Sequence, residues 1–193
     1  MLRELILTMK KKIIAVWRVL LTNCRLMFGK LAHGRNLKYG IATCLAASDE
    51  VFISHRGRLD FGQGLRTRGH CCFNVQENGS LVFEDDVFIN AGCRFNCHKR
   101  IVVGSGCEFG PYVVVYDHDH DFRAIEGLKG GSFSYGDVAI GKNCWIGANV
   151  VILRGTEIGD NCVIAAGSVV KGKIPEGSIF IQKRYADVRK IDK

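Results

Sequence analysis

Two histidines alternate with three aspartates in the stretch DHDHD at residues 117–121. His118 and His120 are two residues apart, so both side chains lie on one face of the chain if this stretch is extended. A neutral imidazole can take the proton of a hydroxyl or amine that attacks a carbonyl near neutral pH. The stretch therefore predicts an acid–base site. Two alternatives stay open, a solvated loop and a metal site, because alternating His and Asp can also ligate zinc.

A polar, Gly-rich excursion surrounds these histidines. It reads DHDHDFRAIEGLKGGSFSYGD over residues 117–137, and more regular sequence resumes at Val138. Long loops in compact domains are more often functional than idle. We expect a protruding loop that carries the candidate base at its start.

The elements that position this loop are indicated by a repeat of six residues. From Ile140 the chain reads IGKNCW, IGANVV, ILRGTE, IGDNCV, IAAGSV and VKGKIP, with an aliphatic residue opening every unit. Further units start at Phe83, Ile89, Val103 and Phe109, whereas before Phe83 the period is blurred. Four of the nine cysteines fall at the fifth, small-residue position of a unit and are expected to be compact core residues: Cys93, Cys107, Cys144 and Cys162.

The period of six predicts a solenoid. Each unit supplies a short strand and a corner, where Gly or Asn accepts a left-handed backbone. Three units close a triangular coil of 18 residues, and stacked coils pair as parallel strands about 4.8 Å apart. The aliphatic first positions would then fill the centre of the prism.

Residues 1–32 form a different kind of segment. They contain no Gly or Pro before Gly29, which predicts a helix, and seven basic residues and one acidic residue lie within residues 1–30. The longest uncharged run, Val19–Cys24, is far short of the roughly 20 residues of a membrane span. Two interpretations remain: an amphipathic helix packed on this chain or a neighbouring subunit, or a basic helix at an anionic membrane surface, with Trp17 and Phe28 near the headgroups.

Composition narrows the function classes. The chain has 193 residues, 47% hydrophobic and 24% charged, which excludes a disordered chain and a polytopic membrane protein. The net charge of +8 rests mainly on residues 1–30, so we expect no nucleic acid partner. The cysteines include no CxxC pair, and we expect a cytoplasmic protein with free thiols.

On these repeats, the chain resembles the hexapeptide-repeat acyltransferases, in the branch of galactoside, maltose and polysaccharide O-acetyltransferases. The resemblance covers about residues 75–181. It implies an all-β solenoid, a left-handed parallel β-helix with a protruding loop, here preceded by an N-terminal α-helix. It also implies a homotrimer whose active sites lie in grooves between subunits, with acetyl-CoA along the coils and no required metal.

The resemblance also assigns roles to particular residues. The family's catalytic histidine falls on the twelfth residue from Phe109, which is His120, and His118 becomes a substrate contact. Asn90 stands where the galactoside and maltose enzymes carry an asparagine that contacts the acceptor. The alternative for Asn90 is a corner residue chosen for backbone tolerance. An acidic contact of the galactoside branch is replaced here by His98.

Coenzyme A contacts are implied at the small residues of the last coils and at nearby basic residues. These are Trp145, Ala148, Ala166, Gly167, Lys171, Gly172 and Arg189. Small residues let the pantetheine approach the main chain, and lysines suit its phosphates. Ala and Gly also suit the corners of any such solenoid, so a structural role stays open for them. The family's closing Gly-x-Pro turn is absent near Gln182.

We therefore expect three parts: a basic helix over residues 1–32, a β-helix over 33–181 with its loop at 117–137, and a tail over 182–193. The expected function is transfer of acetyl from acetyl-CoA to a sugar hydroxyl, in a cell-surface polysaccharide or its precursor, in the cytoplasm or at the inner membrane face. The alternatives are N-acetylation of an amino sugar and a carbonic-anhydrase-like metal protein that uses His98, His118 and His120.

Overall fold

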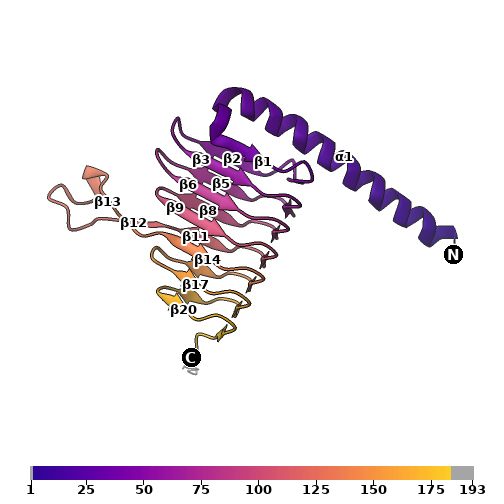
Figure 1. Cartoon of the computed structure of the whole chain (residues 1–193). Helices are drawn as coiled ribbons and strands as arrows, with labels where there is room; N and C mark the ends of the chain where they lie inside the picture. The colour runs from indigo at the N-terminus through magenta and orange to yellow at the C-terminus, as the bar shows by residue number, and fades with distance from the viewer. Residues whose placement is uncertain (1, 184–193) are drawn as a thin grey trace, which may run out of the picture.

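The computed structural model describes residues 2–183 and shows a triangular prism of stacked coils with one long helix at its N-terminal end (Figure 1). Arg189 therefore lies outside the described residues. The helix α1 (Leu2–His33) is followed by the short 3₁₀ helix η1 (Gly34–Asn36). Within residues 2–183, no helix combines the length and apolar character that a membrane crossing requires.

Three parallel sheets form the sides of the prism. Sheet 1 contains β1 (Leu37–Tyr39), β3 (Arg58–Phe61), β6 (Ser80–Phe83), β9 (Arg100–Val103), β14 (Val138–Ile140), β17 (Glu157–Ile158) and β20 (Lys173–Ile174). Sheet 2 contains β4 (Arg66–Thr67), β7 (Phe88–Ile89), β10 (Glu108–Phe109), β15 (Trp145–Ile146), β18 (Val163–Ile164) and β21 (Ile179–Phe180). Sheet 3 contains β2 (Glu50–Ile53), β5 (Cys72–Val75), β8 (Arg94–Cys97), β11 (Val114–Tyr116), β16 (Val151–Ile152) and β19 (Val169–Val170). The β-solenoid predicted from the repeat is confirmed.

The aliphatic first positions of the hexapeptides face inward, as predicted. Ile140, Ile146, Ile152, Ile158, Ile164 and Val170 are all buried, as are the four fifth-position cysteines. At the corners a left-handed residue recurs every six positions, at Asn143, Asn149, Gly155, Asn161 and Gly167. Asn and Gly both tolerate the positive φ that each corner requires.

The N-terminal coils are wider, and this explains why the period of six is blurred before Phe83. Val51 pairs with Phe73 and Phe73 with Phe95, whereas Val151 pairs with Val169 in the C-terminal coils. The wider coils have strands of four residues, and the core there is filled by stacked and edge-to-face phenylalanines. Longer sides leave more space at the centre of the prism, and larger side chains fill it.

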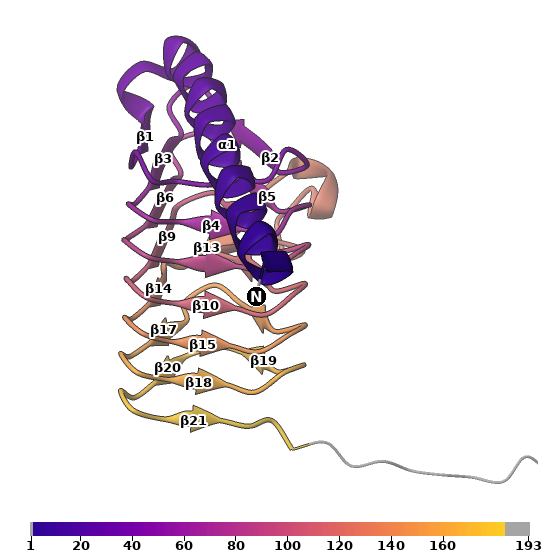
Figure 2. The same ribbon diagram turned by 90° about the vertical axis from the view of Figure 1, so that its right-hand side faces the viewer.

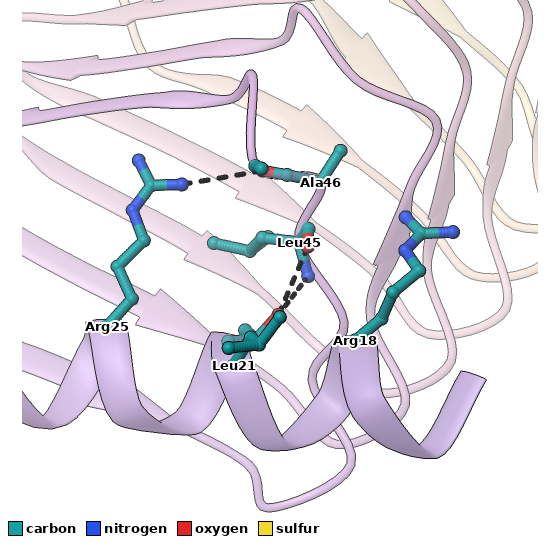
Figure 3. Close-up of a pocket in the computed structure, with 7 residues that line it drawn as sticks. Arg18, Leu21, Arg25, Leu45 and Ala46 are labelled. Carbon is teal, nitrogen blue, oxygen red and sulfur yellow. Dashed lines mark hydrogen bonds between the residues drawn. The ribbon is translucent and has the colours of Figure 1, made fainter. Parts of the chain in front are cut away.

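Two elements depart from the coils (Figures 1 and 2). A hairpin of β12 (His118–His120) and β13 (Phe133–Tyr135), with the 3₁₀ turn η2 (Gly127–Gly130) at its tip, projects from the side of the prism. Among the side chains that the structure describes, α1 bonds to the first coils through residues of its C-terminal half. Thr22 exchanges hydrogen bonds with the main chain of Leu45, and Arg25 reaches the carbonyl oxygen of Ala46, beside a small cavity (Figure 3).

Candidate active site

The predicted site residues gather at two different corners of the prism. Asn90 follows β7, at the corner where sheet 2 turns into sheet 3, which we call the Asn90 corner. The hairpin that carries His118 and His120 leaves the prism where sheet 3 turns into sheet 1, which we call the histidine corner. A single chain therefore does not bring Asn90 and the histidines together.

At the Asn90 corner lies a groove-like cavity of about 410 Å³. Its lining includes four of the predicted residues, Asn90, Trp145, Ala148 and Ala166. Gly167 follows Ala166 directly, at the left-handed corner position. Lys171 and Gly172 follow β19 at the histidine corner, away from this cavity.

Asn90 does not occupy the strained position of its corner. The left-handed residues there are Gly92 and, in successive coils, Tyr112, Asn149 and Gly167, whereas Asn90 has no positive φ. The side-chain oxygen of Asn90 accepts the N–H of Ala91 at 2.9 Å, which directs its amide nitrogen to other partners. Backbone tolerance therefore does not explain Asn90, and a donor role at the cavity remains.

The glycines of the cavity floor do have a structural reason. A Cβ on Gly110 would lie 2.6 Å from the main-chain nitrogen of Ala148, and one on Gly147 would lie 2.5 Å from that of Ala166. Both distances are far below ordinary contact, so the stacking of the coils requires glycine at both positions. A ligand is not needed to explain them.

At the histidine corner, the carboxylate of Asp117 is fully buried and organises the root of the hairpin. The main-chain N–H groups of His98 and Lys99 donate to it at 2.9 and 2.7 Å, and Nδ1 of His118 lies 3.0 Å from its Oδ1. Because an ionised carboxylate only accepts, Nδ1 of His118 must carry a hydrogen, which leaves Nε2 as the free acceptor when the ring is neutral. Of the three aspartates in the DHDHD stretch, Asp117 is the one that is buried.

His98 and His118 are stacked face to face, with ring centroids 3.5 Å apart. Burial, followed by the neighbouring His118, lowers the pKa of His98, so the neutral ring is favoured. Lone pairs of imidazole lie in the ring plane, so two stacked rings do not converge on one ion. Within residues 2–183, His, Cys, Asp and Glu side chains form no group of three that could hold a metal.

His120 is the exposed member of the pair. It lines a cavity of about 420 Å³ together with Tyr116, His118, Asp119 and Leu153, and its ring lies 4.6 Å from that of Phe133. Arg154 Nε donates to Asp119 at 2.6 Å and ties the hairpin to the next coil. Sequence reasoning missed Arg154 and Phe133, since neither the repeat nor the loop composition gives them a role at the site.

Comparisons with known proteins agree with this architecture. Residues 137–172 match the family model described as bacterial transferase hexapeptide (six repeats). WbbJ of Escherichia coli, named as a lipopolysaccharide biosynthesis O-acetyl transferase, is 27% identical over 67% of this chain and 70% of its own length. Rv3034c of Mycobacterium tuberculosis, named as an acetyltransferase, is 35% identical over 81% of this chain, which spans only 52% of that protein.

Among solved structures, a point mutant of AntD, an N-acyltransferase from Bacillus cereus in complex with dTDP and coenzyme A, superposes with a TM-score of 0.64. It covers 83% of this chain and 87% of its own, at 17% identity, so the likeness concerns the fold. The repeat, the parallel prism and the named relatives agree with the resemblance seen in the sequence. Residues 137–172 carry the repeat of the bacterial hexapeptide transferases, and the chain is similar to named acetyltransferases over most of its length.

Proposed function

We propose that this chain transfers acetyl from acetyl-CoA to a sugar hydroxyl of a cell-surface polysaccharide or its precursor. The names of WbbJ and Rv3034c support acetyl transfer, and that of WbbJ supports a glycan acceptor. The observation that carries the proposal is the separation of the two corners. One offers a cavity bordered by Asn90 and small residues, and the other offers an exposed imidazole.

In the proposed reaction His120 acts as the general base. Within residues 2–183 its side chain makes no hydrogen bond, so its ring nitrogens are available to a substrate. The imidazole takes the proton of the acceptor hydroxyl as the oxygen attacks the thioester carbonyl, and returns it to the departing thiolate. The amide nitrogen of Asn90 is placed to donate to the acceptor or to the oxygen that becomes negative. His118, held by Asp117, lines the same cavity as His120 and would contact substrate.

The acetyl donor would lie along the Asn90 corner. Trp145, Ala148, Ala166 and Gly167 line or adjoin the cavity there, on the side of the later coils. Lys171 and Gly172 lie on the other corner, so they could reach this donor only from a neighbouring chain. Arg189 remains a prediction.

We further propose that the protein is a homotrimer in which the histidine corner of one chain faces the Asn90 corner of the next. Mixing two inactive variants tests this arrangement. Chains with His120→Ala and chains with Asn90→Ala, refolded together, should regain up to about a quarter of the activity, since about one interface in four then holds both intact residues. No recovery in mixed trimers would contradict a shared site.

The helix α1 supports a contact with an anionic membrane surface. Its exposed apolar side chains recur at helical spacing and include Ile13, Trp17, Leu20, Phe28 and Leu31, with Trp17 61% and Phe28 65% exposed. Thr22 and Leu26, which are buried against the first coils, lie on the opposite side of the helix. An outward apolar stripe in a basic helix fits the interface of an anionic bilayer. We therefore propose a location at the inner face of the membrane.

Vesicles test the membrane contact. The full chain should bind vesicles that contain anionic lipid in low salt, and Trp17→Glu with Leu20→Glu should abolish the binding. Equal sedimentation of both proteins, or no binding by the unaltered chain, would contradict the proposal. If the unaltered chain does not bind and the double variant dissociates the oligomer, the stripe is instead a subunit contact.

N-acetylation of an amino sugar is the second candidate, and a protein of the same fold is named an N-acyltransferase. A panel of matched amino and hydroxyl sugars, with release of the coenzyme A thiol as the readout, distinguishes the two reactions. Metal analysis of the purified protein, and activity in the presence of a chelator, test the metal-protein alternative.

A further inference from the structure

Two exposed arginines, Arg66 and Arg68, lie on the same side of the prism as Asn90, in the coil above it. Arg66 pairs with Phe88 and Thr67 with Ile89 in the parallel register of β4 and β7, so Arg68 stands one coil above Asn90. The same column continues downward, because Phe88 pairs with Glu108 and Phe109 with Ile146. Arg68 therefore extends, at the N-terminal end, the line of residues that borders the Asn90 cavity.

The two guanidinium groups share one support. The Cζ atoms of Arg66 and Arg68 lie 5.8 and 5.6 Å from the ring centroid of Phe88, on the outer side of sheet 2. A third guanidinium comes from α1, since Arg18 Nη2 donates to the carbonyl oxygen of Thr67 at 3.1 Å. Three positive groups are thus held around one tripeptide of the second coil, Arg66–Arg68.

These charges have no carboxylate partner among residues 2–183. None of the ion pairs there involves Arg18, Arg66 or Arg68. Asp49 lies at the same corner, but it is only 2% exposed and binds the hydroxyl of Thr67 and the N–H groups of Ala46 and Cys71. Like charges gathered in this way repel each other, and an anion would relieve the repulsion.

The position of the cluster indicates which anion. The acetyl donor is proposed to occupy the cavity from Asn90 toward the later coils, so the cluster lies on the side left for the acceptor. One strand spacing, about 4.8 Å, separates the level of Arg68 from that of Asn90. That distance is on the order of the length of one sugar residue. The planar guanidinium forks match the oxygens of phosphate, and two of them suit a phosphate or diphosphate ester.

We propose that the acceptor is a phosphorylated sugar, and that Arg66 and Arg68, assisted by Arg18, bind its phosphate or diphosphate beside the modified ring. This inference rests on the proposed acetyl transfer and names the substrate class of that site. The replacement of the galactoside branch's acidic contact by His98 also removes a negative charge that would repel such an acceptor. A nucleotide sugar and a lipid-linked sugar diphosphate both offer this chemistry.

Pyrophosphate binding tests the charge site without any requirement for activity. Calorimetry would use pyrophosphate as the titrant and low-salt protein already saturated with coenzyme A, so that the donor's own phosphate contacts are filled. We expect one site per chain, weakened at least tenfold by Arg66→Gln with Arg68→Gln. The matched control is Arg58→Gln with Arg100→Gln, which removes two exposed charges from sheet 1 and should leave the affinity unchanged. No binding by the unaltered protein, or equal losses in both pairs, would overturn the proposal.

Acceptor kinetics then test the substrate class. UDP-glucose and a prenyl diphosphate-linked glucose should each have a KM at least tenfold below that of free glucose, and the arginine pair variant should erase this advantage. The better of the two compounds identifies the source of the phosphate. Equal KM values for free and phosphorylated sugars would overturn the proposal. Absence of acetyl transfer to every acceptor would count against the proposed function, while the pyrophosphate result would still decide the charge site.

Discussion

At the Asn90 corner the chain passes from sheet 2 to sheet 3 in every coil without interruption, whereas at the histidine corner it leaves the prism from Asp117 to Asp137 before returning. The first corner is built from small residues, and its glycines are fixed by the coil beneath. The second depends on a buried carboxylate and stacked aromatic rings. The regular corner can hold a long ligand along the coils, and the irregular one can present a base. The proposed reaction uses both corners, and the proposed trimer would bring them together across two chains.

The largest expected effect belongs to the exposed imidazole of the histidine corner. His120→Ala should lower kcat by about 10²–10⁴-fold, the usual cost of a lost general base, because no other group would take the hydroxyl proton. Coenzyme A binding, measured by calorimetry, should persist because the donor is proposed to lie at the other corner. His118→Ala is the matched control and should mainly raise the acceptor KM. A comparable loss of kcat from His118→Ala alone would mean that the base is His118.

The next effect concerns the buried carboxylate. Asp117→Ala should destabilise the fold by at least about 1–3 kcal/mol, because the N–H groups of His98 and Lys99 lose their acceptor in a buried site. Chemical denaturation of the variant measures the loss. Asp85→Ala is the control, since its carboxylate accepts a hydrogen bond from the N–H of Gln63 at an exposed position. Equal stability of the two variants would show that the histidine corner does not depend on Asp117.

At the Asn90 corner, neighbouring small residues should behave differently. Ala148→Trp should raise the KM for acetyl-CoA by at least about tenfold, equivalent to roughly 1.4 kcal/mol, with a smaller effect on stability, because its side chain lines the cavity. Gly147→Ala should instead lower the thermal midpoint, since its Cβ would clash with the main chain of Ala166. Steady-state kinetics and melting curves on both variants check the contrast. If Ala148→Trp lowered the thermal midpoint as much as Gly147→Ala, the expected contrast between the two positions would be contradicted.

The smallest effect is a pH dependence at the histidine corner. The pKa of His98 is lowered in the folded protein, first by burial and then by the charge of His118, so the unfolded chain binds a proton more readily. The resulting stability is present above the unfolded pKa of about 6.5 and is lost as the pH falls through the lower folded value. Melting curves between pH 7.5 and 5 should therefore decline less in His98→Gln than in the unaltered protein. An identical decline would assign the effect to other groups.

Much of the fold could be predicted because the hexapeptide pattern is local. Every sixth residue from Ile140 to Val170 is buried, and the corner residues have the φ that Asn and Gly tolerate. The wide N-terminal coils could not be predicted from the same period of six residues. Their strands of four residues lengthen each side, and phenylalanines such as Phe73 and Phe95 replace the aliphatic residues.

For the site, the sequence supplied residue types, and the spacing of His118 and His120 predicted a shared face. Their common cavity agrees with this expectation. Arg154 and Phe133 could not be found, because they reach the hairpin from a later coil and from the opposite strand. The arginine cluster was likewise hidden, since half of a helix and more than one full coil of the prism separate Arg18 from Arg68.

The sequence by itself determined the six-residue coil, because each strand and corner depends on residues that are close together in the chain. It also determined that an imidazole stands where the coil is interrupted. Only the tertiary structure decided that Asn90 and His120 occupy different corners, that Asp117 is withdrawn from water, and that three guanidinium groups share one end of the groove. Those facts depend on contacts between stacked coils, which join residues about 20 positions apart. No pattern among neighbouring residues in the sequence reveals such contacts.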